Sequence, residues 1–395
     1  MRPFLAFCLL LGITLPCQAQ GDKTKPNTLT PKEIADGWIL LFDGETTFGW
    51  DVKGEAEVKD GLLVLGRAST IAPKAHFAEC ELIFECQVAG KGEPSVDLYP
   101  KGNWWLLQRG LLGFGDREGW TSVRSILEKS KETKNRVVVH GEFKGPAGAG
   151  KAQRAANGDA YGEIRFKSPG GCKLFLRNIK LRPVNAASLF NGKDLDGWKE
   201  FPGKKSKFAV VDGAINVKNG PGDLQTNGKY KDFILQLECI SHGKHLNSGI
   251  FFRCRDNEYQ NGYEAQIRNQ FTPEATQEYT IEEYDPKTNK LIGKNKIKST
   301  AFDYGTGAIY RRQPARKEMA KDGEWFGMTI VAQGNHLATW VNGVQVTDWY
   351  DNRPQSGNAR TGCKLEAGHI SIQGHDPTTN LSFRNFRIAE MPEMK

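Results

Sequence analysis

Hydrophobic and polar residues alternate over many short stretches of this 395-residue chain. The runs are rich in β-branched or aromatic residues, are bounded by Gly, Asn or Asp, and include Phe233–Cys239, Gly327–Ala332, Leu337–Val341 and His369–Gln373. Such runs are typical of strands, and Asn342-Gly343 between two apolar runs is a strong hairpin signal. Only Pro31–Asp36 and Ala315–Lys321 have a helical pattern. The pattern predicts an all-β protein made of sandwiches or jelly rolls.

The stretch Asn247–Ile267 predicts two neighbouring strands that share one polar face. Side chains alternate between the two faces of a strand. One face would therefore carry an amide, a guanidinium, a carboxylate and a second amide, from Asn247, Arg253, Glu264 and Gln266. Gly249 lies among them, and a glycine inside a strand often marks a close approach of another group to the backbone. For any one of these residues, a solvated sheet face is the simpler interpretation.

An internal repeat divides the chain. Four markers return in the same order: LFDG before Trp50 as LFNG before Trp198, Asp60-Gly61 as Asp212-Gly213, Glu85-Cys86 as Glu238-Cys239, and LRNIKL as FRNFRI. Repeated order of this kind indicates two copies of one domain. We therefore expect a signal peptide at 1–19, a linker or lead-in at 20–37, a first copy at 38–184 that has lost part of the pattern, and a second copy at 187–391.

The second copy is the longer one. The offset between the copies grows from 153 residues at Cys86 and Cys239 to 207 at the closing strand, a net insertion of 54 residues. Long additions to a rigid β scaffold usually serve binding or catalysis. The insertion region contains Glu282-Glu283-Tyr284, Gly307–Tyr310 and Asn335-His336. Copy one has Lys167-Ser168-Pro169 where copy two has Gln373-Gly374-His375, and Trp104 and Leu106 near the places of Glu264 and Gln266. We expect any site to belong to copy two.

The first residues, MRPFLAFCLLLGITLPCQAQ, fit a secretory signal peptide that is cut after Ala19. Acylation at Cys17 ranks second, because Pro16 is a poor match for the small residue that lipoprotein processing needs. No later apolar run approaches the ~20 residues of a membrane span. We expect an exported protein of the periplasm or the extracellular space.

Charge and cysteine content narrow the possible partners. The formal net charge is +8 with lysines and arginines scattered, which indicates a solvated surface and no nucleic-acid partner. Six cysteines follow the leader, an even number that permits disulfides in an oxidising compartment: Cys80, Cys86, Cys172, Cys239, Cys254 and Cys363. Their spacing does not fit a zinc site. No cofactor is certain and a divalent metal stays open, although nothing near His242 and His245 completes a metal site.

Several motifs of the second copy together resemble the family of 3-keto-disaccharide hydrolases. They are LFNGKDLDGW, NSGIFFR, YEAQI, TGAIY, GEW, WVNG, GHISIQGH and FRNFRI, in this order. The resemblance covers Ala187–Met391, whereas the first copy resembles the family only at its opening and closing strands. It implies two tandem concanavalin A-like, laminin-G-like jelly rolls, and cleavage of glycosides that are oxidised to a ketone at C3 of the sugar.

A ketone at C3 constrains the residues that such a reaction needs. It makes the C2 hydrogen acidic, so a base near C2, a stabilised enolate oxygen and an acid at the glycosidic oxygen would expel the C1 leaving group. Direct hydrolysis would instead need two carboxylates roughly 5–9.5 Å apart. We expect the catalytic residues to be Glu264, His375, Arg253 and Tyr310, and the substrate-binding residues to be Asn247, Gln266, Glu282, Trp340 and Gln373.

Structural alternatives accompany these assignments. Glu264 is the preferred carboxylate and Glu282 the second, whereas His375 is either base or acid, or only a turn histidine. Trp340 could stack on a sugar ring, but a tryptophan beside a hairpin is more often part of a core. The expected partner is an oligosaccharide or glycoside, and the oligomeric state is open. A non-catalytic carbohydrate-binding protein is the alternative function, since fold does not fix function.

Overall fold

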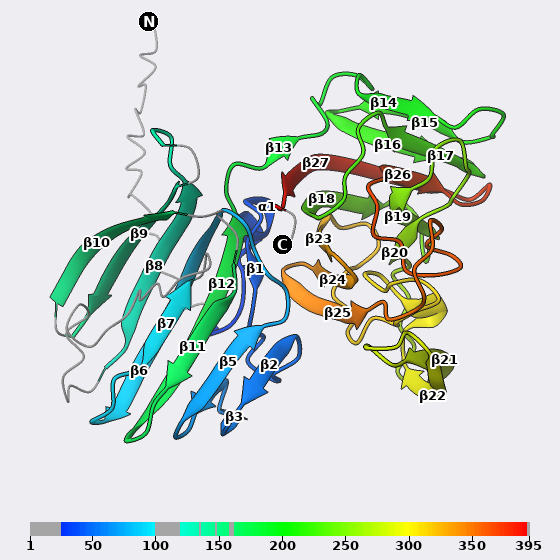
Figure 1. Ribbon diagram of the computed structural model, residues 1–395. Helices are drawn as coiled ribbons and strands as arrows, with labels where there is room; N and C mark the ends of the chain where they lie inside the picture. Colours follow the sequence, from blue (N-terminus) through cyan, green and yellow to red (C-terminus); the bar gives the residue numbers. More distant parts are fainter. Residues whose placement is uncertain (1–24, 99–118, 134–135, 147, 158–161, 393–395) are drawn as a thin grey trace, which may run out of the picture.

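The computed structural model describes residues 25–98, 119–133, 136–146, 148–157 and 162–392, which form two pairs of β-sheets lying side by side (Figure 1). The signal-peptide prediction and the positions of Trp104 and Leu106 lie outside the described residues. We call the two halves the N-terminal sandwich, built from β1–β12, and the C-terminal sandwich, built from β13–β27. The all-β prediction is confirmed.

The strands of the N-terminal sandwich are β1 Ile39–Leu40, β2 Trp50–Lys53, β3 Ala56–Lys59, β4 Leu62–Leu65, β5 Ser69–Pro73, β6 Cys80–Gly90, β7 Ser95–Leu98, β8 Thr121–Lys129, β9 Arg136–Gly145, β10 Gly148–Asn157, β11 Ile164–Ser168 and β12 Cys172–Pro183. Its large sheet has the order β10-β9-β8-β6-β12-β4-β3, with β1 also paired to β12. Its small sheet has the order β2-β5-β11-β7.

The strands of the C-terminal sandwich are β13 Ala187–Ser188, β14 Trp198–Glu200, β15 Lys207–Val211, β16 Ala214–Lys218, β17 Gly222–Thr226, β18 Phe233–Ser241, β19 Ser248–Cys254, β20 Tyr263–Ile267, β21 Gln277–Tyr284, β22 Leu291–Ser299, β23 Phe326–Gln333, β24 His336–Val341, β25 Val344–Tyr350, β26 His369–Gly374 and β27 Asn380–Glu390. A 3₁₀ turn, η1, spans Phe302–Tyr304.

The two halves have the same strand order. The large C-terminal sheet runs β25-β24-β23-β18-β27-β16-β15 with β13 beside β27, and the small one runs β14-β17-β26-β19-β20. Every N-terminal strand thus has a C-terminal counterpart in the same place, as two copies of one fold would give. Strand β20 and the hairpin β21–β22 have no counterpart among the described strands, and both belong to the region that contains the predicted insertion.

One short helix is present among the described residues, α1 Pro31–Ala35. Thr30 caps it with a reciprocal capping box, in which its hydroxyl accepts from the Glu33 N–H and the Glu33 carboxylate accepts from the Thr30 N–H. The second helical prediction, Ala315–Lys321, is wrong. The N–H groups of Ala315 and Arg316 donate instead to the carbonyls of Tyr304 and Val346, at 2.9 and 3.0 Å.

The two sandwiches share a continuous apolar junction. The N-terminal core extends into side chains on the outward face of the large C-terminal sheet, namely Ile234, Val331, Ala338 and Trp340. Trp340 is 1% exposed and its indole N–H donates to the Leu40 carbonyl at 3.0 Å. The prediction that Trp340 binds substrate is therefore wrong, because both its ring and its donor are committed to the junction.

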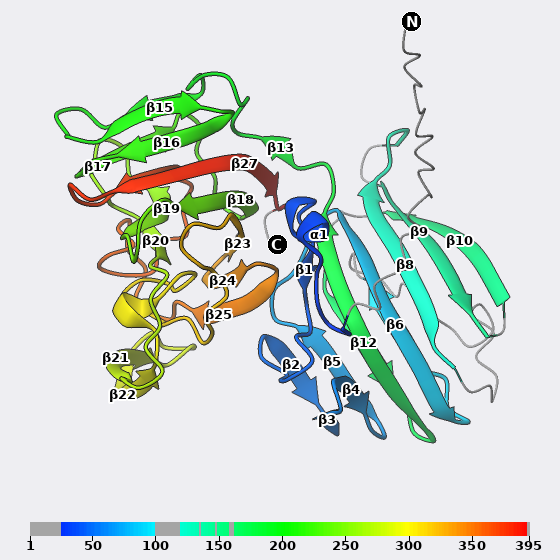
Figure 2. The same cartoon turned by 180° about the vertical axis from the view of Figure 1, so that it is seen from behind.

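The lead-in is docked between the sandwiches, with α1 at their junction (Figure 2). Gln236 of β18 donates to the Gly37 carbonyl at 2.8 Å, and Arg387 of β27 donates to the Ala35 carbonyl at 2.9 Å. Asn27 exchanges two hydrogen bonds with the backbone and side chain of Asn178. The residues from Lys25 onward are thus part of the packed structure rather than a free linker.

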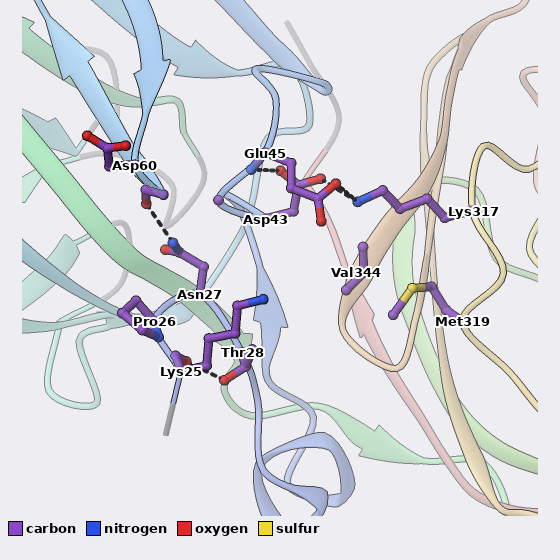
Figure 3. Close-up of a pocket in the computed structure, with 12 residues that line it drawn as sticks. Lys25, Pro26, Asn27, Thr28, Asp43, Glu45, Asp60, Lys317, Met319 and Val344 are labelled. Atoms are coloured by element: carbon purple, nitrogen blue, oxygen red, sulfur yellow. Dashed lines mark hydrogen bonds and ion pairs between the residues drawn. The ribbon is translucent and has the colours of Figure 1, made fainter. Parts of the chain in front are cut away.

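A hollow of about 490 Å³ lies beside the junction (Figure 3). Its walls are residues 25–28 of the lead-in, 43–45 after β1, 60–61 of the β3–β4 turn, and Lys317, Met319 and Val344. Two ion pairs cross it: Lys317 contacts Glu45 at 2.6 Å, and Arg316 contacts Asp43 at 2.6 Å. These ion pairs join the two sandwiches, so we assign the hollow to the junction.

The six cysteines are buried and free, and form no disulfide in the structure. Burial raises the pKa of the Cys80 and Cys86 thiols to about 12, so both are protonated at neutral pH. Within the described part of the chain, no helix has the length and apolar character needed to cross a bilayer.

Candidate functional site

The small sheet of the C-terminal sandwich has one polar face across four adjacent strands. Directly opposed residues of antiparallel strands have their side chains on the same face. The register of β17, β26, β19 and β20 places Asp223, Gln373, Gly249 and Gln266 in one row and Gln225, Ser371, Phe251 and Glu264 in the next. We call these eight positions the polar face.

The opposite face of the same strands is core. Leu224, Ile250, Ala265 and Ile372 alternate with the polar positions and are each 0% exposed. Burial of these aliphatic side chains fixes the alternation, since a shift of one residue would exchange the two faces. The polar side chains are consequently turned away from the core by the packing of their neighbours.

Glu264 lies near one margin of the polar face and is 8% exposed. A Cβ atom placed on Gly249 would lie 2.7 Å from the Glu264 Oε1 atom, so the carboxyl occupies the space above this glycine. The predicted gap at Gly249 is real, and the group that enters it is Glu264 itself. Burial, and then the charges of Asp303 and Asp223, raise the pKa of Glu264 to about 8, although Arg360 and Arg311 oppose the shift.

Asp303 joins the polar face from η1, where it has a φ of 49°. Its Oδ2 atom accepts from the Asn247 amide at 3.0 Å and from the Gln266 amide at 3.2 Å. The Asp303 carbonyl also accepts from Gln266, at 3.1 Å. These bonds hold the two predicted substrate-binding amides in fixed orientations, and they leave the amide oxygens of both directed elsewhere.

The segment Gly307–Tyr310 continues the small sheet beyond β20. The Tyr310 N–H donates to the Glu264 carbonyl at 2.9 Å, and Ile309 bridges Ala265. Burial raises the pKa of Tyr310, and the charges of Asp303 and Glu264 add to the shift, which places its hydroxyl in their neighbourhood. The structure thus brings Tyr310 together with Glu264, and the phenol is a neutral donor at pH 7.

Asp223 is a second buried carboxyl on the polar face, which our sequence analysis missed. It is 1% exposed, and its Oδ2 atom accepts from the Gln260 N–H at 3.0 Å. Burial raises the pKa of Asp223 to about 7, while the Gln260 hydrogen bond and the charges of Lys204 and Arg360 oppose the rise. The alternation Asp223-Leu224-Gln225 was visible in the sequence, but two polar residues on one short strand are also common on solvated sheets.

Unpartnered polar atoms gather on this face. Seven buried side-chain atoms on it or beside it have no hydrogen-bond partner among the described residues: Asp223 Oδ1, Gln225 Nε2, Asn247 Oδ1, Tyr259 Oη, Gln266 Oε1, Ser371 Oγ and Gln373 Oε1. Buried polar groups in folded proteins are nearly always hydrogen-bonded, so a cluster of exceptions needs an explanation. A ligand rich in hydroxyl groups would satisfy both the donors and the acceptors of this set.

Arg253 is a wrong catalytic prediction. Its side chain is 0% exposed, and its guanidinium donates to the carbonyls of Lys231, Gly334 and Lys364 and pairs with Asp232 at 2.8 Å. The alternation breaks before it, because the β19–β26 register shifts between Phe251 and Cys254 and Arg253 has a φ of 52°. A β-bulge of this kind sends the side chain to the other side of the strand.

Two further predicted residues lie at the edges of the site. His375 follows β26, two residues past Gln373, and its Nδ1 atom is 2.8 Å from the Asp376 carboxylate. Its side chain is 42% exposed, as a turn residue at the rim would be. Glu282 lies on the hairpin strand β21, where it contacts Lys294 at 3.4 Å and accepts from the Tyr284 hydroxyl at 3.0 Å. These partners lower the pKa of Glu282, which is therefore ionised.

The described residues contain no group of three or more His, Cys, Asp and Glu side chains arranged to hold a metal ion. His242 and His245 contact protein groups instead: His242 Nε2 lies 2.8 Å from the Ser382 hydroxyl, and His245 Nδ1 lies 2.8 Å from the Asn269 carbonyl. The chemistry that this face can carry out with its own residues is that of two carboxyls, amides and hydroxyls.

Comparisons with known proteins found similar chains among solved structures and one matching family model. No curated protein matches the chain. Two crystal structures of Parabacteroides distasonis ATCC 8503 proteins assigned as glycosyl hydrolases are similar at 27% and 20% identity, with TM-scores of 0.37 and 0.39. The matches cover 53% and 52% of this chain, and 85% and 94% of those chains. A carbohydrate-binding module, CBM66 from Bacillus subtilis, is similar at 13% identity over 49% of this chain and 96% of that one, with a TM-score of 0.31.

A family model matches residues 185–389, which is more than half of the chain and contains the whole polar face. The matched model describes the 3-keto-alpha-glucoside-1,2-lyase-like domain. The suspected resemblance is thereby confirmed, and this carbohydrate-active protein belongs to the 3-keto-alpha-glucoside-1,2-lyase-like family.

Proposed function

We propose that the protein cleaves the glycosidic bond of 3-keto-glycosides by elimination across C1 and C2, with hydration of the product to follow. The observation that carries this proposal is the buried, raised-pKa carboxyl of Glu264 among unpartnered amides and hydroxyls. The family match supports the substrate class. The ketone makes elimination accessible, because the carbanion left at C2 delocalises onto O3.

Glu264 is the proposed acid. With a pKa of about 8 it keeps its proton at neutral pH, so it can protonate the glycosidic oxygen as the C1–O bond breaks. An ordinary exposed glutamate would be ionised at this pH and could not do so. Tyr310, which is neutral, adds a hydroxyl donor beside it.

Asp223 is the proposed base at C2. Its pKa of about 7 leaves a large ionised fraction at neutral pH, and a base whose pKa is near the working pH is the most effective one. Its unpartnered Oδ1 atom is available for the C2 proton. His375 at the rim is the second candidate for this role, with its ring oriented by Asp376.

The remaining polar groups suit the sugar. Gln225 and Tyr259 have unpartnered donors that can hydrogen-bond the enolate oxygen at O3, whereas the amide oxygens of Asn247, Gln266 and Gln373 can accept from sugar hydroxyls. Gln225 and Gln373 are fixed by the sheet, and Asn247 and Gln266 by Asp303, so little conformational freedom of these four groups would be lost on binding.

Direct hydrolysis by two carboxylates is the second candidate mechanism. The Glu264 carboxyl lies above Gly249 on β19, two strands from β17, so about 10 Å separates it from the backbone of Asp223. Inverting glycosidases hold their two carboxyls roughly 6.5–9.5 Å apart, and the Asp223 side chain extends from that backbone on the same face as Glu264. Asp223 therefore replaces Glu282 as the partner of Glu264 in this alternative. A non-catalytic sugar-binding face is the third candidate, because unpartnered amides would serve it equally well.

Deuterium at C2 of a 3-keto-glucoside distinguishes the three candidates. Elimination predicts a primary isotope effect or loss of the label to water, whereas direct hydrolysis retains the label at full turnover. Asp223→Asn or His375→Ala, whichever removes the base, should abolish exchange, while Glu264→Gln should slow release and leave exchange running. Sugar binding without any turnover would exclude both cleavage mechanisms and support the non-catalytic sugar-binding face.

Export is a separate proposal, based on the leader. Expression with the full leader in a Gram-negative host, followed by mass spectrometry of the secreted or periplasmic protein, should find Gln20 at the N-terminus. A full-length cytoplasmic product would contradict it.

A further inference from the structure

A cavity of about 310 Å³ lies between the hairpin β21–β22 and the residues that follow Tyr310. Its lining includes the charged and aromatic residues Glu282, Tyr284, Lys294, Arg311, Arg312, Trp349 and Arg353. The hairpin has no counterpart among the described strands of the N-terminal sandwich, so this cavity is particular to the C-terminal one. Its volume is at the lower end of the range for ligand pockets, about 300–1,000 Å³, and suits one sugar unit or a small aromatic group.

The cavity has an excess of positive charge. Arg311 and Arg312 have no carboxylate within 4.0 Å among the described residues, although the other two cationic groups of the lining, Lys294 and Arg353, each have one. Arg353 is paired with Asp351 at 2.8 Å, and Lys294 shares Glu282 at 3.4 Å. Arg312 is only partly exposed, and one of its N–H groups donates to the Arg360 carbonyl at 3.0 Å.

Arg312 is partly withdrawn from solvent beside another arginine. Burial, and then the positive charge of Arg353, lower the pKa of Arg312, and the charges of Asp351 and Glu282 oppose the shift without reversing it. Two guanidinium groups held close together in a partly buried place favour an anion between them. The lining of the cavity therefore has more positive than negative charge, which an anionic ligand would balance.

Aromatic rings form the other part of the lining. Trp349 is half-buried, lies edge-on to Tyr263 with centroids 6.5 Å apart, and has the Arg353 guanidinium 5.9 Å from its ring. Tyr284 is tethered through its hydroxyl to Glu282. Rings beside guanidinium groups suit an acidic saccharide or an acidic aromatic group better than a free inorganic anion, because they also contact its apolar face.

The cavity is joined to the polar face through two consecutive residues. Tyr310 bonds the Glu264 backbone and lies near its carboxyl, and Arg311, the next residue, lines the cavity. The charge of Arg311 also acts on both Glu264 and Tyr310. A substrate whose cleaved bond lies at Glu264 would thus extend its leaving group toward the arginines.

We propose that this cavity binds an anionic group, a carboxylate or a sulfate ester, on the leaving-group side of the substrate. The inference rests on the proposed function for its orientation relative to the cleaved bond, but the presence of an anion site does not depend on catalysis. The occupant is an acidic glycoside: a uronic acid, a sulfated sugar or an aglycone that carries a carboxylate.

Binding is tested first, without turnover, by calorimetry on the full chain with methyl glucuronide, glucose 6-sulfate and methyl glucoside as probes. We expect one of the acidic probes to bind at least about tenfold more tightly than the neutral one, as for a charge-assisted hydrogen bond. The stronger of the two identifies carboxylate or sulfate. Arg312→Gln should remove this preference, and Arg311→Gln, at an exposed position, provides a second variant if the first folds poorly.

Lys298→Gln is the matched control, since it removes one positive charge from an exposed position of the same hairpin that does not line the cavity. It should retain the preference for acidic probes. Equal binding of acidic and neutral probes by the unaltered protein, or an equal loss in the Lys298 control, would overturn the inference.

Turnover then distinguishes the inference from the proposed function. Two 3-keto-glucosides are compared, with 4-carboxyphenyl and 4-(methoxycarbonyl)phenyl leaving groups. Arg312→Gln should lower the ratio of kcat/KM for the acidic over the neutral substrate at least about tenfold. If neither substrate is cleaved while acidic probes still bind through Arg312, the proposed function fails and the anion site stands. If both are cleaved with a ratio that Arg312→Gln leaves unchanged, the anion site fails alone.

Discussion

The small sheets of the two sandwiches share their strand order but differ in the face that each turns away from its core. The register places Lys167 of β11 where the C-terminal sandwich has Gln373, and Asp97 of β7 where it has Phe251. Lys167 and Asp97 form an ion pair with each other. The N-terminal face therefore pairs its lysine with its aspartate and leaves only the Asp97 Oδ1 atom without a partner among the described residues, whereas seven such atoms gather on or beside the C-terminal face.

The outward faces of the two large sheets also differ, and here the C-terminal sandwich has apolar residues where the N-terminal one has charged residues. Trp340 and Ile234 of the C-terminal sandwich correspond in register to Glu142 and Glu81 of the N-terminal one. The first two are buried at the junction, while Glu142 is 44% exposed and pairs with Lys151 at 2.8 Å. The two sandwiches share a fold but differ in role. The N-terminal sandwich covers the large sheet of the C-terminal one, and the C-terminal sandwich carries the candidate site.

The largest expected effect concerns the small-sheet faces. Glu264→Gln and Asp223→Asn should each lower kcat on a 3-keto-glucoside about 10²–10⁴-fold, the usual contribution of a general acid or base. Product release followed by NMR or coupled absorbance measures the change. Asp97→Asn, a matched change on the N-terminal face, should alter kcat less than about threefold, because Asp97 is only paired with Lys167. A collapse of turnover in the Asp97 variant, with intact folding, would place the chemistry in both sandwiches.

Trp340→Ala should lower the stability of the protein by weakening the junction between the two sandwiches. A buried tryptophan replaced by alanine typically costs about 3–5 kcal/mol of unfolding free energy, and here the Leu40 carbonyl also loses its donor. Denaturant unfolding of the full chain measures the loss. Glu142→Ala, at the corresponding exposed position, should leave the transition nearly unchanged. An equally small effect at Trp340 would mean that the sandwiches do not stabilise each other.

The sequence predicted the fold well, because its signals are local. The alternation of apolar and polar residues predicted the strands. Glu264 and Gln266 lie on the same face of β20, as side chains two residues apart in a strand should. Lys167 and Gln373, which the repeat markers align, lie on strands β11 and β26, and these strands have the same place in the two small sheets. These features depend on neighbours within a strand, so one sequence contains the information.

The candidate site was only partly predictable, because its remaining features depend on distant packing. The bulge at Arg253 reverses a side chain that alternation would place with Glu264. Asp303 reaches the face from a 3₁₀ turn that no periodicity marks, and Trp340 is buried only because another sandwich covers it. Asp223 became a candidate through its burial, which the pattern of a five-residue strand does not reveal.

A smaller effect follows from the burial of Glu264. Its pKa is raised to about 8 from an ordinary 4.5, so the folded protein holds this proton more tightly than the unfolded chain does. The contribution of this group to stability is complete below about pH 4.5 and is lost as the pH rises toward 8. Glu264→Gln should therefore raise the unfolding free energy relative to the unaltered protein by a few kcal/mol more at pH 9 than at pH 5. Thermal unfolding at both pH values measures this, with Glu366→Gln, the same substitution at an exposed position, as the control.

The smallest effect tests how the Glu264 carboxyl is seated. A methyl group at Gly249 would lie 2.7 Å from the Glu264 Oε1 atom and 2.9 Å from its Cγ, so Gly249→Ala must displace the carboxyl while leaving its chemistry intact. A misplaced acid is less effective, and we expect kcat to fall about tenfold, or about 1.4 kcal/mol of transition-state stabilisation. The isotope exchange at C2 should continue, because the base is on another strand. Ser95 corresponds to Gly249 in the N-terminal sheet, and Ser95→Ala should leave kcat unchanged. Unchanged kcat in Gly249→Ala, with Glu264→Gln inactive, would show that the carboxyl works from a position other than the space above this glycine.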